Sequence, residues 1–265
     1  TAEQGKPIAD SRAEVAHGAS FIEWFAEEAR RIYGETIPAN DPSKRFVVIR
    51  QPIGVCAAIT PWNLPLAAIT RKVAPALAAG CPVVVKPSEA TPLTALALAE
   101  LAQRAGMPSG VLNVITADSA NSVEVGKVLS SSDIVRHLSF TGSTEVGRVL
   151  MRQCAPTVKK LGLELSGQAP FIVFDDADLD SAVDGAIAAR FGNAGQACAS
   201  ANRFYVQAGI HDAFVAGLAE KARALKVGNG FEPGVALGPL IDDEAIAHVE
   251  SLVAGALAGG TRLVT

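Results

Sequence analysis

Hydrophobic residues follow two alternating spacings along most of the chain. Short runs such as 82–86 (PVVVK) are apolar at successive positions, which is typical of parallel strands covered on both faces. Longer stretches such as 67–79 and 91–104 place apolar residues at every third or fourth position, as amphipathic helices do. The alternation predicts an α/β protein with a doubly wound parallel sheet.

This pattern assigns most of the chain to helices and strands. We expect strands at 45–50, 54–60, 82–86, 111–116, 134–140, 158–165, 169–174, 203–206 and 262–265. We expect helices at 11–33, 67–79, 91–104, 122–129, 144–153, about 180–190 and 210–225. Residues 34–41 are predicted to be a turn-rich break, and 191–199 to be irregular. Two prolines make 61–65 an ordered loop rather than a strand.

Length and sequence character indicate how the chain divides. Its 265 residues suffice for one large domain or two medium ones. Because the pattern changes after Ser166, we expect one domain at 1–166 and another at 167–265. The chain begins at Thr1 in a helix pattern and ends at Thr265 in a strand pattern. We therefore expect it to be a piece of a longer polypeptide, incomplete at both ends.

Composition excludes several classes of protein. The net charge of −4 gives no reason to expect nucleic acid or an anionic membrane as a partner. No apolar stretch reaches the roughly 18 residues of a transmembrane helix. The four cysteines form no CxxC pair, which argues against a disulfide framework and favours the cytoplasm. The four histidines lack metal-ligand spacing, so we expect no metal.

Several short motifs carry the candidate chemistry. They are PWNLP at 61–65, KPSE at 86–89, FTGSTEVG at 140–147, and LELSG at 163–167 with NAGQAC at 193–198. In this order and spacing they resemble the aldehyde dehydrogenase superfamily over essentially the whole chain. The ordered set is far more specific than any single motif. The sequence around these motifs is most similar to that of succinate-semialdehyde dehydrogenases. The resemblance implies an incomplete cofactor domain at 1–166 and an incomplete catalytic domain at 167–265.

Cys198 is the candidate nucleophile. It lies in a glycine-containing irregular segment, and a thiolate can add to a carbonyl and still permit loss of hydride. The alternative for any cysteine is a small buried hydrophobic residue, and we keep that interpretation for Cys56, Cys81 and Cys154. Many related enzymes have a second cysteine two residues after the nucleophile. Ser200 stands there, which removes a redox switch through that disulfide.

The resemblance implies two further catalytic residues. Asn63 would donate its side-chain amide to the oxyanion, beside the backbone N–H of Cys198. Glu164 would be the general base that activates water to hydrolyse a thioester. The alternatives are a turn asparagine between prolines and a helix-capping or salt-bridged surface carboxylate. Ser166 replaces the glycine that usually follows this glutamate by two residues, which bears on the local backbone.

The resemblance also implies a dinucleotide site. The form G-x-T-x-x-G at 142–147 lies between a predicted strand and helix, where backbone amides can approach a pyrophosphate. The implied cofactor-binding residues are Thr60, Pro61, Trp62, Lys86, Ser88, Glu89, Gly126, Phe140, Thr141, Gly142, Ser143, Gly147 and Leu165. Glu89 can accept both ribose hydroxyls and repels a 2′-phosphate, which favours NAD over NADP. The alternative for Lys86 and Glu89 is a solvated ion pair at a helix start.

The substrate is the least determined feature. Arg71 matches one of two arginines that hold the distal carboxylate in succinate-semialdehyde enzymes, but Gly192 stands in place of the other. We expect a semialdehyde acid as the substrate, and the alternative is a neutral or larger aldehyde. The alternative for Arg71 is an ordinary arginine on a helix surface. Residues 34–52 resemble the strand segment of subunit contacts, so we expect a homodimer or homotetramer of the intact protein.

Two other functions remain open. A CoA-acylating dehydrogenase would use the same cysteine, but such enzymes generally lack the base at Glu164. A non-catalytic NAD-binding fragment is the second, because the family's later Glu-x-Phe-Gly-Pro segment does not occur before Thr265.

Overall fold

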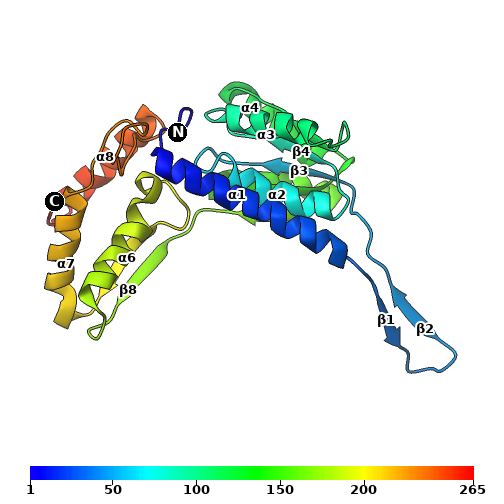
Figure 1. Ribbon diagram of the computed structural model, residues 1–265, viewed down its shortest axis with the longest axis horizontal. Helices are drawn as coiled ribbons and strands as arrows, with labels where there is room; N and C mark the ends of the chain where they lie inside the picture. Colours follow the sequence, from blue (N-terminus) through cyan, green and yellow to red (C-terminus); the bar gives the residue numbers. More distant parts are fainter. The chain divides into compact units, whose positions relative to one another are not determined.

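A computed structural model describes residues 1–265, and the chain divides into two compact units (Figure 1). One unit comprises Ala13–Leu165. The other comprises Thr1–Arg12 together with Ser166–Thr265. The assignment of cofactor binding and catalysis to separate domains stays a prediction.

The unit Ala13–Leu165 is built around a five-stranded parallel sheet of order β5-β4-β3-β6-β7. Its strands are β3 (Val55–Ile59), β4 (Val83–Lys86), β5 (Leu112–Val114), β6 (Val135–Thr141) and β7 (Lys160–Glu164). The chain adds β4 and β5 on one side of β3, then returns to place β6 on the other side. The strand order therefore reverses between β3 and β6, which is where sheets of this kind bind ligands.

Helices cover both faces of this sheet. They are α2 (Ala67–Ala78), α3 (Pro92–Arg104), α4 (Ser119–Ser131) and α5 (Thr144–Cys154). Successive residues of β3 point to opposite faces, so Cys56 and Ala58 join one core and Ala57 joins the other. The first core includes Ile69 and Val73 of α2, and the second includes residues of α4 and α5. The predicted doubly wound sheet is confirmed.

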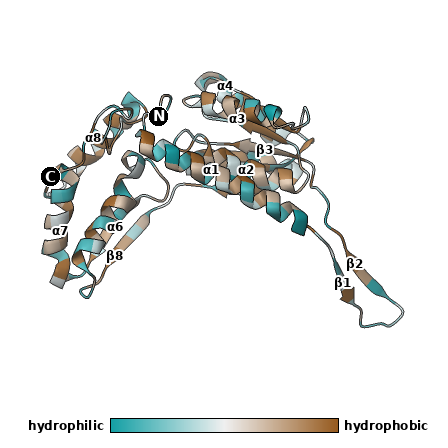
Figure 2. Cartoon of the chain, in the orientation of Figure 1, coloured by the Kyte–Doolittle hydropathy of each residue, from teal (hydrophilic) through white to brown (hydrophobic).

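The same unit contains a long helix and a hairpin. Helix α1 (Ile8–Glu28) begins in the other unit and is followed by a 3-10 turn, η1 (Ala29–Arg31). Strands β1 (Glu35–Pro38) and β2 (Arg45–Val48) form an antiparallel pair in which every residue is exposed. Figure 2 shows hydrophobic segments along this hairpin. The prediction of a turn-rich break at 34–41 was wrong, because β1 pairs with β2 there.

The second unit is smaller. Strands β8 (Ala169–Val173) and β9 (Ala201–Val206) pair in parallel, and helices α6 (Leu179–Phe191) and α7 (Ala208–Arg223) pack with them. Its core includes Val173, Val183, Ala186 and Phe214, and the rings of Phe171 and Phe204 lie 5.4 Å apart.

Near the end of the chain one predicted strand does not form and one helix was missed. The expected strand at 262–265 does not form, because these exposed residues have no partner strand to complete a hydrogen-bonded ladder. Helix α8 (Asp243–Ala258) was not predicted, although Asp242 caps it by accepting a hydrogen bond of 2.8 Å from the backbone of Ala245.

The first twelve residues cluster with this second unit, whereas the sequence placed them in the domain 1–166. The backbone N–H of Ile8 donates to the carbonyl of Gly230 over 2.8 Å. A Cβ at Gly238 would lie 2.0 Å from the carbonyl oxygen of Gly5, so the two segments touch backbone to backbone. No helix in the structure has both the length and the apolar composition needed to cross a membrane.

Candidate active site

Predicted cofactor residues gather where β3, β4 and β6 end. Thr60 directly follows β3 and is buried, and its backbone N–H donates to the carbonyl of Lys86 at the end of β4 over 3.1 Å. Phe140 and Thr141 close β6, with Phe140 buried. Because the strands are parallel, these ends share one edge of the sheet at the point where strand order reverses.

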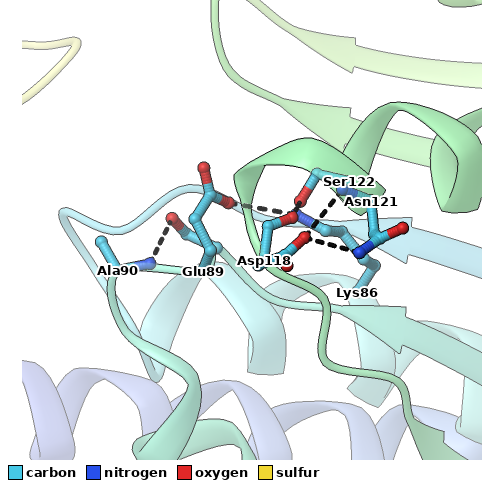
Figure 3. A network of polar contacts seen from close by, with 7 residues as sticks. Lys86, Glu89, Ala90, Asp118, Asn121 and Ser122 are labelled. Carbon is cyan, nitrogen blue, oxygen red and sulfur yellow. Dashed lines mark hydrogen bonds and ion pairs between the residues drawn. The ribbon is translucent and has the colours of Figure 1, made fainter.

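An ion pair and a capped helix stand beside this edge (Figure 3). The ammonium Nζ of buried Lys86 lies 3.3 Å from Oε2 of Glu89, whose side chain is 40% exposed. Asp118 accepts 2.8 Å hydrogen bonds from the backbone and side chain of Asn121, and so caps α4. The hydroxyl of Ser122 donates to the carbonyl of Asp118 over 2.8 Å.

The same network keeps Glu89 ionised. Burial by itself raises the pKa of Glu89. The backbone N–H of Glu89 itself, the charge and hydrogen bond of Lys86, and the nearby hydroxyl of Ser122 outweigh burial and leave this pKa below its ordinary value of 4.5. Lys86 and Glu89 therefore form an ion pair in which the lysine is buried and the carboxylate is partly exposed.

Side chains pack closely against two glycines at the turn between β6 and α5. A Cβ at Gly142 would lie 2.4 Å from the ring of Phe140, and one at Gly147 would lie 2.6 Å from Leu165. Ser143 caps α5 by accepting a hydrogen bond of 3.3 Å from the backbone of Val146. The turn thus presents a helix N-terminus, whose partial positive charge favours an anionic group.

The other predicted cofactor residues follow β3 and β4 or lie on α4. Pro61 and Trp62 are half-buried after β3, and buried Ser88 accepts a hydrogen bond of 3.3 Å from the backbone of Ala90. Gly126 lies on α4 with no atom within 4 Å of where a Cβ would be. A strand edge, an ionised carboxylate, a helix N-terminus and an open glycine are features that fit a nucleotide.

Asn63 lies in the loop that joins β3 to α2. Its side chain is half-buried, and α2 begins four residues later at Ala67. The carboxylate of Glu14 on α1 accepts hydrogen bonds from the backbone N–H groups of Leu66 (2.9 Å) and Ala67 (3.2 Å). Sequence reasoning missed Glu14, because it lies 52 residues from its first partner.

A pocket of about 620 Å³ brings the predicted base and the predicted substrate arginine together in the Ala13–Leu165 unit. Arg71, Lys72 and Glu164 all line it. Arg71 is half-buried, and its buried Nε has no hydrogen-bond partner in the protein. Glu164 is exposed at the end of β7.

Lys72 was not predicted to belong to the site. Its Nζ donates to the hydroxyl of Ser139 over 2.8 Å. Burial, and then the neighbouring guanidinium of Arg71, lower the pKa of Lys72 to about 8, and the carboxylate of Glu164 opposes the shift only in part. The pocket is therefore a place where added negative charge would be favoured.

The loop 192–198, which carries the candidate nucleophile Cys198 and is called the nucleophile loop below, lies in the other unit. Its 3-10 turn, η3 (Gly192–Gly195), contains three consecutive residues in the left-handed region: Asn193 (φ 52°), Ala194 (φ 55°) and Gly195 (φ 75°). Positive φ is costly for the two residues that are not glycine. Cys198 lies three residues after Gly195 and is the one exposed cysteine of the four.

Polar contacts within this unit hold the loop. Asp10 accepts a hydrogen bond of 3.2 Å from the backbone N–H of Asn193. The side chain of Gln196 donates to the carbonyl of Asn193 over 3.2 Å and accepts from the backbone N–H of Ile241 over 3.0 Å. Gly192 is exposed with no atom within 4 Å of where a Cβ would be.

The chain belongs to the aldehyde dehydrogenase family, whose model matches residues 1–265. It is 59% identical over 264 residues to the succinate-semialdehyde dehydrogenase [NADP(+)] of Escherichia coli, covering 100% of this chain and 54% of that protein. It is 58% identical over 265 residues to a glutarate-semialdehyde dehydrogenase of Pseudomonas putida, covering 100% and 55%.

Among solved structures, an aldehyde dehydrogenase from Brucella melitensis biovar abortus superposes with a TM-score of 0.96 at 60% identity, covering 99% of this chain and 54% of that chain. The chain thus spans about half the length of the curated relatives it matches.

Proposed function

We propose that the full-length protein oxidises an aldehyde to the carboxylic acid, with hydride transfer to NAD and with Cys198 as the nucleophile. The observation that carries this proposal is the exposed Cys198, three residues after a left-handed turn, in a chain whose whole length matches the aldehyde dehydrogenase family. The three other cysteines are buried, which suits structural roles.

The proposed reaction forms and breaks one carbon–sulfur bond. The Cys198 thiolate adds to the aldehyde carbon, and the resulting oxyanion accepts hydrogen bonds from the Cys198 backbone N–H and the Asn63 amide. The nicotinamide cofactor, when bound, supplies the acceptor for the hydride that leaves this carbon. The product is a thioester on Cys198. Glu164 then takes a proton from water, whose oxygen adds to the thioester carbon, and the sulfur leaves as a thiolate with release of the acid.

NAD is the proposed cofactor, with NADP as the alternative. The ionised carboxylate of Glu89, beside the carboxyl end of β4, supports NAD because it would repel a 2′-phosphate. The name of the E. coli relative specifies NADP(+), and this supports the alternative.

The proposed substrate is a semialdehyde acid such as succinic semialdehyde. The names of the relatives specify succinate and glutarate semialdehyde, and Arg71 lines a pocket beside Lys72 that favours an anion. The open space at Gly192 supports the competing proposal of a neutral or larger aldehyde. The exposed apolar residues of β1 and β2 support the further proposal of a homodimer or homotetramer.

The test is NADH or NADPH formation by the full-length protein with a panel of aldehydes, alongside Cys198→Ala. We expect the wild type to oxidise semialdehyde acids fastest and the variant to lose activity, with buried Cys154→Ala as the matched control. Retained activity in Cys198→Ala would overturn the mechanism. CoA-dependent turnover would instead favour a CoA-acylating enzyme, and cofactor binding without oxidation of any aldehyde would favour a non-catalytic protein.

A further inference from the structure

Helix α1 carries two carboxylates one helical turn apart, Asp10 and Glu14, that accept hydrogen bonds from backbone outside the helix. Glu14 contacts the start of α2 within the Ala13–Leu165 unit. Asp10 contacts the nucleophile loop within the other unit. Neither residue belongs to a motif of the proposed site, and the proposed mechanism assigns neither of them a step.

Glu14 supplies a cap that α2 lacks in its own sequence. The N-cap position of α2 is Leu66, which has no polar side chain and so cannot cap the helix through a side-chain hydrogen bond. One oxygen of the Glu14 carboxylate, 2.9 Å from the N–H of Leu66 and 3.2 Å from that of Ala67, takes this place. A negative charge at a helix N-terminus is also favoured by the helix dipole.

Packing reinforces the same contact. Gly18 lies one turn after Glu14 on α1 and is buried, and a Cβ there would lie 3.0 Å from Cγ of Leu66. Leu66 is therefore held by both its backbone and its side chain. Only Leu64 and Pro65 separate it from Asn63, and proline fixes one of the intervening dihedral angles. Displacement of Leu66 would therefore be passed on to Asn63.

Asp10 makes the corresponding contact with the nucleophile loop. It binds the N–H of Asn193, the first of three consecutive left-handed residues, five positions before Cys198. Asn193 is 8% exposed, so Asp10→Ala would remove a hydrogen bond from the backbone of a buried residue. The left-handed turn would then relax more readily.

We propose that Glu14 is a positioning residue for Asn63, and that Asp10 independently is a positioning residue for Cys198. The proposal rests on the proposed function of these two groups. Each carboxylate acts by fixing backbone N–H groups next to a reacting side chain and touches no substrate atom.

The test of Glu14 compares Glu14→Ala with Glu14→Gln in the full-length protein. Glutamine keeps an acceptor oxygen, so it should rescue most of the function. We expect Glu14→Ala to lower kcat about tenfold with KM changed less than about threefold, and Glu14→Gln to stay within about threefold of wild type. Glu23→Ala, an exposed position on the same helix, is the matched control.

Thermal unfolding distinguishes positioning from folding. A kcat loss that only follows the unfolded fraction, a folded Glu14→Ala with wild-type kcat, or a Glu14→Gln as slow as Glu14→Ala would each overturn the Glu14 proposal. Activity retained in Cys198→Ala would mean that the proposed function itself had failed, whatever Glu14 does.

The test of Asp10 has a readout besides activity. We expect Asp10→Ala to change the rate of Cys198 alkylation by iodoacetamide at least about threefold and to lower kcat, with Asp10→Asn close to wild type. Exposed Asp176→Ala is the control. Wild-type alkylation and kcat in a folded Asp10→Ala would overturn the Asp10 proposal.

Discussion

Replacing Glu89 by serine should move cofactor preference from NAD towards NADP. Glu89 is ionised, 3.3 Å from the ammonium of Lys86, and 40% exposed beside the end of β4. A carboxylate that accepts hydrogen bonds from a ribose 2′-hydroxyl would lie roughly 4–5 Å from a phosphorus attached to that oxygen. Serine removes the repelling charge and leaves Lys86 to attract the phosphate.

The size of the effect follows from these charges. At an effective dielectric constant of about 40–80, two unit charges about 4.5 Å apart repel by about 1–2 kcal/mol. The phosphate carries between about one and two charges, and Lys86 partly offsets the repulsion. We therefore expect Glu89→Ser to change the NAD-to-NADP preference by about 2 kcal/mol, or about 30-fold.

The assay is kcat/KM for each cofactor at a saturating aldehyde concentration, with direct titration of both cofactors. Glu89→Gln should shift the preference in the same direction, because it removes the charge and keeps the size. Glu100→Ser, at an exposed position on α3, should leave it unchanged. An unchanged ratio in Glu89→Ser, or a wild type that prefers NADP, would refute this account of selectivity.

Two further predictions concern stability, measured by urea unfolding. Val158 is a β-branched residue at φ 52° and 87% exposed, so Val158→Gly should stabilise the chain by about 1 kcal/mol by relieving strain without losing burial; an equal or lower free energy of unfolding would contradict this. For Lys72 the pKa of about 8 in the folded chain lies below the ordinary lysine value of 10.5, so the unfolded chain binds more protons between these values and stability should rise with pH across that window. The rise should be about 2 kcal/mol after allowance for solvent screening, and smaller in Lys72→Met; equal pH dependence in both proteins would show that Lys72 is not its source.

The sequence pattern predicted those helices and strands that can be recognised from their own residues, without knowing which segment they pair with. The apolar runs of β3 and β4 and the alternating apolar positions of β6 predicted a parallel sheet because a helix pattern follows each of them in the chain. The run at 262–265 has a similar composition, but no strand pairs with it. Strand β1 was missed because its pairing with β2 depends on a neighbour rather than on its own polar, proline-containing sequence.

The residues of the candidate site also fall into those recognisable from local sequence and those that depend on distant contacts. Lys86, Glu89 and Gly142 belong to short motifs, so their chemistry could be predicted from sequence. Asp10 lies 183 residues from its partner and Glu14 lies 52 residues from its first partner, and no local pattern links them. Their roles depend on where distant segments meet, which only the folded chain provides.

Because the four cysteines differ in exposure, thiol labelling can report on unfolding without an added probe. One thiol is exposed and three are buried in the native fold. A brief pulse of a thiol reagent should therefore add one label to a native molecule and four to an unfolded one, a difference that intact mass resolves for each molecule. Because Cys56 and Cys81 share one core and Cys154 belongs to another, intermediate label counts would reveal whether the two faces of the sheet open together or in turn.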